Sequence, residues 1–211
     1  MSGIPNLPVF LAAALILLLT PGPAVLYIIA RSLDQGRLAG LVSVLGIEAG
    51  NFVHVLAVTL GLSALLASSA VLFSMVKILG AAYLVYLGLR RIWTRESIFQ
   101  PDGTERRSPA GIFRQAVAVA VLNPKTAIFF LAFLPQFVDA SKGSVPLQLF
   151  ALGCLFVLMA VCTDGLYALA AGSAGRWLKQ APFFVQTERH IIGSVYIGLG
   201  IFAALAGIWN T

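Results

Sequence analysis

Residues 7–30 read LPVFLAAALILLLTPGPAVLYIIA, an apolar run that is interrupted in its middle by Thr20-Pro21-Gly22-Pro23. The run is long enough to cross a membrane, because a spanning helix needs about 20 apolar residues. Proline inside a helix removes a hydrogen bond and clashes with the carbonyl four residues before it. The run therefore predicts a transmembrane helix that breaks near the bilayer midplane, where unwound backbone must be buried in protein or line a cavity.

The composition of the whole chain is also that of a membrane protein. Of its 211 residues, 59% are hydrophobic and 10% are charged, against about 45–50% and about 25% in soluble domains. This excludes a soluble enzyme, a disordered segment and a disulfide scaffold. The net charge of +6 does not indicate nucleic-acid binding, because most of the cations lie in short loops between apolar runs.

The apolar runs predict an all-α polytopic membrane protein with six transmembrane helices. A polar stretch from Arg90 to Arg114 divides them into two groups of three. We expect a single transmembrane domain (1–211) made of a first three-helix repeat (1–92), a cytoplasmic linker (93–111) and a second three-helix repeat (112–211). The approximate helix ranges are Leu7–Ala30, Leu38–Leu66, Val71–Ile92, Ile112–Val138, Pro146–Gly172 and His190–Trp209.

The distribution of cations predicts the orientation. Eleven of the 14 Lys and Arg residues follow the first, third and fifth helices, whereas only Lys77 and Lys142 lie on the opposite side. Short loops that are rich in Lys and Arg face the cytoplasm. Both termini are therefore expected on the periplasmic side, and the Arg90–Arg114 linker in the cytoplasm.

The two halves of the chain share local features. Gly80-Ala81-Ala82-Tyr83 recurs as Gly193-Ser194-Val195-Tyr196, and the break in the first helix has a counterpart at Asn123-Pro124-Lys125 in the fourth. Because each half has three crossings, the halves must insert in opposite orientations, as in the inverted repeats of secondary transporters. A chance match in apolar sequence is the alternative, and the paired prolines favour a duplication.

The two breaks are the predicted substrate site. Freed amides and half-helix N-termini attract a carboxylate, and freed carbonyls attract an ammonium group, so a zwitterion such as an amino acid suits both. A proline kink that serves only packing is the alternative. The expected binding residues are Thr20, Pro21, Gly22, Pro23, Asn123 and Pro124, together with Asn51 of the second helix.

Four ionisable residues are candidates for proton coupling or charge compensation. Glu48 and Asp164 lie near the middle of the second and fifth helices, where a charge costs about 2.5–3.5 kcal/mol. Each is either a proton carrier or a structural hydrogen-bond acceptor. Lys125 either binds a substrate carboxylate or, as we favour, neutralises one of these acids. His54 is either a proton shuttle or, more in keeping with its apolar setting, a packing histidine.

Several motifs together resemble the LysE/RhtB family of amino-acid exporters. The resemblance spans nearly the whole chain and is closer to the RhtB-like homoserine/threonine type than to the lysine exporters. It implies a multi-pass protein of the bacterial inner membrane that exports amino acids or related small zwitterionic metabolites, driven by the proton gradient. The motifs are Thr20-Pro21-Gly22-Pro23, Gly46-x-x-x-Gly50-x-x-x-His54, Gly80-x-x-Tyr83-Leu84-x-Tyr86-Leu87-Gly88, and Leu122-Asn123-Pro124-Lys125 through Leu134-Pro135-Gln136-Phe137.

The predicted function is therefore secondary active amino-acid export by alternating access, with proton antiport. The alternatives are a passive channel and an intramembrane enzyme that uses Glu48 and Asp164, although the sequence has neither a filter loop nor a metalloprotease or serine-hydrolase motif. No catalytic residue, cofactor or metal site is predicted, because Cys154 and Cys162 have no partner at ligand spacing. The expected partners are the amino acid, protons and lipid. Gly46 and Gly50 form a glycine stripe on the second predicted helix, which we expect to pack closely against another helix. A homodimer is a candidate assembly for the same reason.

Overall fold

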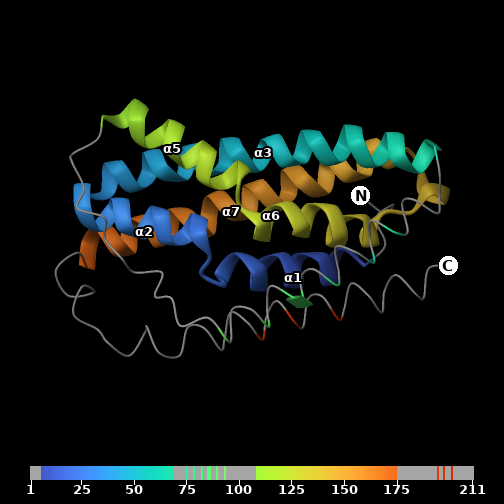
Figure 1. Cartoon of the computed structure of the whole chain (residues 1–211), viewed down its shortest axis with the longest axis horizontal. Coiled ribbons are helices and arrows are strands. Elements are labelled where there is room, and N and C mark those ends of the chain that lie inside the picture. Colours follow the sequence, from blue (N-terminus) through green and yellow to red (C-terminus); the bar gives the residue numbers. More distant parts are fainter. Residues whose placement is uncertain are drawn as a thin grey trace.

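The computed structural model describes residues 6–68 and 108–174, together with isolated helical positions between 75 and 93 and between 194 and 201. Every element in this part of the chain is helical (Figure 1). In order, they are α1 (Leu7–Leu19), α2 (Pro23–Gln35), α3 (Arg37–Ser68), α5 (Pro109–Val121), α6 (Pro124–Ile128), the π-helical turn η1 (Phe129–Phe133), the 3-10 turns η2 (Leu134–Phe137) and η3 (Ala140–Lys142), and α7 (Val145–Ala174).

Two of these helices, α3 and α7, are long and apolar enough to cross a membrane by themselves. Two bent pairs pass the same test: α1 with α2, which bend by 48°, and α5 with α6–η2, which bend by 46°. The described residues thus contain two spans, or four if each bent pair is one broken span. Apart from the isolated helical positions, the predicted third and sixth helices, most of the linker and the repeat motifs lie outside the described residues.

The first predicted helix extends further than the sequence analysis expected. It continues past Ala30 to Gln35 and stops at Gly36, whose φ of +87° is unfavourable for any residue with a side chain. The chain reverses at this glycine and enters α3 at Arg37, whose Nη2 donates a hydrogen bond of 2.8 Å to Ser173 Oγ. The end of α2, the start of α5 and the end of α7 lie at the same end of the bundle (Figure 1).

Close packing of α3 on α5 depends on two glycines. A Cβ atom at Gly46 would lie 2.5 Å from the Cβ of Ala116 and 2.6 Å from the carbonyl oxygen of Phe113. At Gly50 it would lie 2.5 Å from the Cβ of Ala120. The expectation that this glycine stripe packs against another helix is confirmed, and the partner is α5. Small residues let helix backbones approach in this way inside membranes.

A phenylalanine cluster surrounds the second half of the broken α5–α6 span. The turn η1 places Phe129 and Phe130 in the interior, fully buried. The ring of Phe156 on α7 lies 4.9 Å from the ring of Phe129 and 5.1 Å from that of Phe130, measured between centroids. Such aromatic contacts fix Phe156 against η1, so its other face forms a rigid wall of the site described next.

Candidate functional site

The break between α1 and α2 frees main-chain carbonyls that a continuous helix would use. Pro21 has no N–H group, so the carbonyl of Leu17, four residues earlier, loses its usual donor. Lys125 of α6 fills this role: its Nζ donates to the oxygen of Leu17 at 2.7 Å and to that of Thr20 at 2.5 Å. The ammonium group thus caps the C-terminal end of α1.

A second carbonyl at the same break is satisfied from α7. Pro23 cannot donate to the carbonyl of Leu19, again four residues before the proline. The hydroxyl of Tyr167 donates to this oxygen at 2.9 Å. Side chains from two other helices thus replace the donors that the two prolines remove, and this holds the break open.

At the break between α5 and α6, a proline again removes the donor of the carbonyl four residues before it, and other groups replace that donor. Pro124 removes the donor for the carbonyl of Ala120, which instead accepts hydrogen bonds from the backbone amide of Asn123 at 3.0 Å and from His54 Nε2 at 3.1 Å. The imidazole also stacks on the ring of Phe130, with 6.2 Å between centroids. His54 therefore lies at the α5 side of this break and does not line the cavity described below.

The two half-helices that begin at the breaks differ in their N-terminal caps. Asn123 caps α6, because its Oδ1 accepts from the amide of Lys125 at 3.1 Å and its Nδ2 donates to Thr126 Oγ1 at 3.1 Å. The N-cap of α2 is Gly22, which has no side chain that could accept a hydrogen bond from the first amides of the helix. Within the described residues, no hydrogen bond reaches the amides of Ala24 and Val25. The N-terminus of α2 thus has two backbone amides that are free to donate to an acceptor.

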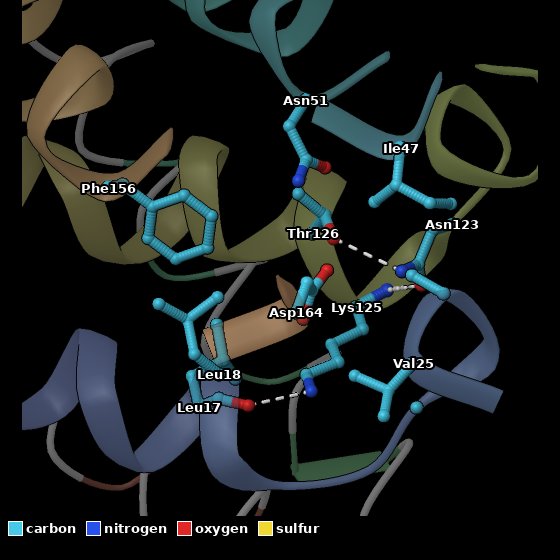
Figure 2. Close-up of a pocket in the computed structure, with 12 residues that line it drawn as sticks. Leu17, Leu18, Val25, Ile47, Asn51, Asn123, Lys125, Thr126, Phe156 and Asp164 are labelled. Carbon is cyan, nitrogen blue, oxygen red and sulfur yellow. Dashed lines mark hydrogen bonds between the residues drawn. The ribbon is translucent and has the colours of Figure 1, made fainter. Parts of the chain in front are cut away.

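A small cavity lies between the two breaks (Figure 2). Its volume of about 30 Å³ is of the order of one water molecule, so an amino acid requires the site to expand. The lining residues come from α1, α2, α3, α6, α7 and the segments at the two breaks. They are Leu17, Leu18, Gly22, Ala24, Val25, Ile47, Asn51, Asn123, Lys125, Thr126, Phe156 and Asp164.

Unpartnered acceptors gather at the α3 and α7 side of this cavity. Asn51 Nδ2 donates to Glu48 Oε2 at 3.0 Å, and the carboxyl groups of Glu48 and Asp164 are neighbours. Glu48 itself does not line the cavity. Glu48 Oε1, Asn51 Oδ1 and Asp164 Oδ1 are buried without a hydrogen-bond partner in the described structure. Buried acceptors are normally satisfied, so the arrangement indicates a ligand or a proton that donates to them.

The hydrogen-bond partners of Lys125 are not the two acids, and its predicted role in charge compensation stays a prediction. Asp164 lies beside the Lys125 side chain in Figure 2 and interacts with it electrostatically, but among the described residues the hydrogen-bond partners of the ammonium group are carbonyl oxygens. Carbonyl partners became available because a proline lies four residues after Leu17. The choice of these partners over an acid depends on how α6 packs against α1, which the sequence does not reveal.

The structure brings most of the predicted site residues together. Gly22, Asn51, Asn123, Lys125 and Asp164 line the cavity, whereas the predicted Thr20, Pro21, Pro23 and Pro124 form the breaks beside it. Tyr167 and seven lining residues were not predicted from the sequence; the seven are Leu17, Leu18, Ala24, Val25, Ile47, Thr126 and Phe156. Tyr167 had a detectable signal, because it follows Asp164 by three residues and therefore shares its helix face.

Comparison with known proteins identifies the family. The model of the LysE type translocator family matches residues 15–207. An uncharacterized membrane protein of Vibrio cholerae serotype O1 is 32% identical over 93% of this chain and 95% of its own length. An uncharacterized membrane protein of Bacillus subtilis, YrhP, is 30% identical over 95% of this chain and 99% of its own length. The leucine efflux protein of Salmonella typhimurium is 25% identical, with 93% of each chain covered. No solved structure is significantly similar. The family resemblance of the sequence motifs is confirmed: the chain belongs to the LysE type translocator family.

Proposed function

We propose that the protein exports neutral amino acids by secondary active transport and that the cavity between the two helix breaks is the binding site. The observation that carries the proposal is the presence of opposite polarities in one cavity. The uncapped N-terminus of α2 offers amide donors, and Asp164 and Asn51 offer buried acceptors without partners. A zwitterion is the class of solute that satisfies both sets of groups.

The proposed binding mode places each end of the amino acid on the group of opposite polarity. The α-carboxylate accepts from the free amides at the start of α2, where the helix dipole also favours negative charge. The α-ammonium donates to Asp164 Oδ1 and Asn51 Oδ1, which are both buried. The observed cavity is too small for this ligand, so binding requires α1–α2 to move away from α3 and α7.

The walls of the cavity support a neutral, apolar substrate side chain. Leu18, Val25, Ile47 and Phe156 supply apolar surface, and the ammonium group of Lys125 disfavours a second positive charge nearby. Curated relatives carry the name leucine efflux protein, which agrees with this substrate class. Leucine is therefore the first amino acid to test.

We propose that the proton gradient drives export through the acidic pair. The substrate ammonium needs a free carboxylate on Asp164, whereas a proton shared with the neighbouring Glu48 occupies the same acceptor. A proton that arrives from outside therefore competes with the substrate for one site, and this exchange is the basis of antiport. His54 already bonds the freed carbonyl of Ala120, so we propose that it contributes to the break and not to proton transfer.

The arrangement in the membrane is part of the same proposal. We propose six transmembrane helices in two inverted three-helix repeats, in the bacterial inner membrane, with both termini periplasmic. The end of the bundle that carries Arg31, Arg37 and Arg114 then faces the cytoplasm, as Lys- and Arg-rich loops do. The predicted homodimer would need another surface, because Gly46 and Gly50 pack against α5 within the chain.

Proteoliposomes test the transport proposal. We expect vesicles loaded with labelled leucine to release it faster when the outside is made acidic, and a protonophore to abolish this difference. Asp164→Asn should lose the response, whereas Asp139→Asn, which removes an acid of the η3 loop, should keep it. The absence of gradient-dependent release across neutral, acidic and basic amino acids would contradict the proposal.

The same preparation separates transport from the two alternatives. Release that ignores the gradient, together with unitary currents in planar bilayers, would indicate a passive channel. Turnover of a lipid or peptide that is lost in both Glu48→Gln and Asp164→Asn would indicate an intramembrane enzyme. We expect neither result, because the family is one of translocators.

A further inference from the structure

We propose that the carbonyl oxygens of Leu17 and Thr20 form a site for a small monovalent cation, which Lys125 fills with its own ammonium group. The inference goes beyond the amino-acid site, because it concerns the C-terminal end of α1 and not the N-terminus of α2. It predicts that a free cation binds there once the lysine side chain is removed.

The geometry of the ammonium group is that of a bound ion. Its Nζ lies 2.7 Å from the oxygen of Leu17 and 2.5 Å from that of Thr20, and only 7% of the Lys125 residue is exposed. Two main-chain oxygens that converge on one cation replace part of its hydration shell, as carbonyl groups do in ion pathways. Unwound carbonyls at broken helices coordinate monovalent cations in transporters for the same reason.

The sequence around the break keeps these oxygens available. Because Pro21 has no N–H group, the oxygen of Leu17 lacks the usual donor four residues later, and its backbone partner is the amide of Thr20 at 3.2 Å, which leaves its second lone pair for a cation. The negative end of the α1 dipole also points at the ammonium group, which favours any cation at this place. The freed carbonyl of Leu19 is taken by Tyr167, and the proposed cation site consists of the two oxygens that Lys125 contacts.

Negative charge nearby supports a cation and not a neutral donor. From α7, Asp164 lines the same cavity as Lys125, and from α3 the neighbouring Glu48 adds a second acid. Tyr167 is the other titratable group of α7 at this break. When the lysine charge is removed, no positive charge balances the acids and the carbonyl oxygens. A soluble cation of similar size can restore this positive charge.

The tethered ammonium has a consequence for coupling. A cation that is covalently attached cannot be exchanged between the two sides of the membrane, so the wild-type protein has no use for sodium or potassium at this site. The lysine also joins α6 to the end of α1 and so connects the two broken spans. The wild-type protein should therefore respond equally to all monovalent salts.

The test is the cation dependence of Lys125→Ala. The purified variant is unfolded by heat in detergent with sodium, potassium, ethylammonium or N-methylglucamine chloride at equal ionic strength. We expect ethylammonium and at least one alkali ion to raise the midpoint, with N-methylglucamine as the cation that is too large to enter. Wild type, Lys125→Met, which fills the space with an uncharged chain, and Lys142→Ala, which removes an exposed lysine of η3, should show no difference among the four salts.

Transport provides the second readout and depends on the proposed function. In proteoliposomes, we expect ethylammonium to raise leucine release by Lys125→Ala about tenfold relative to N-methylglucamine, and to leave Lys125→Met unchanged. Identical unfolding midpoints of Lys125→Ala in all four salts would overturn the cation site, whatever the outcome for transport. If the alanine variant is not recovered in folded form, Lys125→Ser, whose short side chain also leaves the space next to the two carbonyls open, takes its place under the same criterion.

Discussion

A double-mutant cycle between Tyr167 and Pro23 tests how the break in the first span is maintained. In the structure, the hydroxyl of Tyr167 donates to the oxygen of Leu19 at 2.9 Å. Pro23 has no N–H group and cannot donate to this carbonyl. Tyr167→Phe leaves this oxygen without a donor. Pro23→Ala supplies an N–H group at the position from which a helix donates to Leu19. The two substitutions must therefore interact energetically.

The size of the interaction follows from hydrogen bonding inside membranes. Interhelical hydrogen bonds of this kind contribute about 0.6 kcal/mol on average and about 1.7 kcal/mol at most. We expect Tyr167→Phe to lower the free energy of unfolding by this amount in the wild-type background. In Pro23→Ala the cost should largely disappear, because the new amide can bond Leu19. The coupling energy should then lie in the same range.

The assay is equilibrium unfolding in mixed micelles with increasing dodecyl sulfate, followed by circular dichroism. Tyr27→Phe is the matched control, because its hydroxyl donates to the oxygen of Ile112 in α5 and not to a carbonyl of the proline break, so its cost should be equal in both backgrounds. A cost of Tyr167→Phe that is the same with proline or alanine at position 23 would refute the reasoning.

Three further predictions concern packing, coupling and the second break. Gly46→Ala should destabilise the protein by about 1–3 kcal/mol, because the added Cβ overlaps α5. Gly61→Ala should not, because a Cβ at this position meets no atom within 4 Å. Unfolding in micelles compares the two variants. Asp164→Asn should weaken pH-driven efflux at unchanged abundance in the membrane, and unaltered transport would remove this acid from coupling. His54→Gln retains a donor for the carbonyl of Ala120 and should keep both the stability of the protein and the pH profile of efflux. A shifted profile would indicate that His54 takes part in proton transfer.

The position of both breaks could be predicted from the sequence because proline acts on its own helix. Pro21, Pro23 and Pro124 each remove a defined donor, and the structure bends the helices at these places by 48° and 46°. The uncapped start of α2 is also readable, since glycine precedes Pro23 whereas Asn123, a good N-cap, precedes Pro124. Local chemistry of this kind does not depend on the rest of the fold.

The partners of the long side chains could not be predicted in the same way. Lys125 reaches carbonyls that are 105 and 108 residues away in sequence, and such contacts follow from the packing of α6 against α1. The π-helical turn η1, which sets the wall of the site through Phe156, has no clear sequence signal. The helical end at Gln35 was missed because a polar turn after an apolar run resembles a loop.

The most direct test of the central claim is whether an amino acid occupies the space at the start of α2. In a background with both Cys154 and Cys162 replaced by alanine, Val25→Cys places one thiol in the cavity wall, and Ser141→Cys places a control thiol in the exposed η3 turn. The account predicts that leucine slows the modification of Val25→Cys by a methanethiosulfonate reagent and leaves that of Ser141→Cys unchanged. Equal rates at position 25 with and without a full panel of neutral amino acids would contradict it.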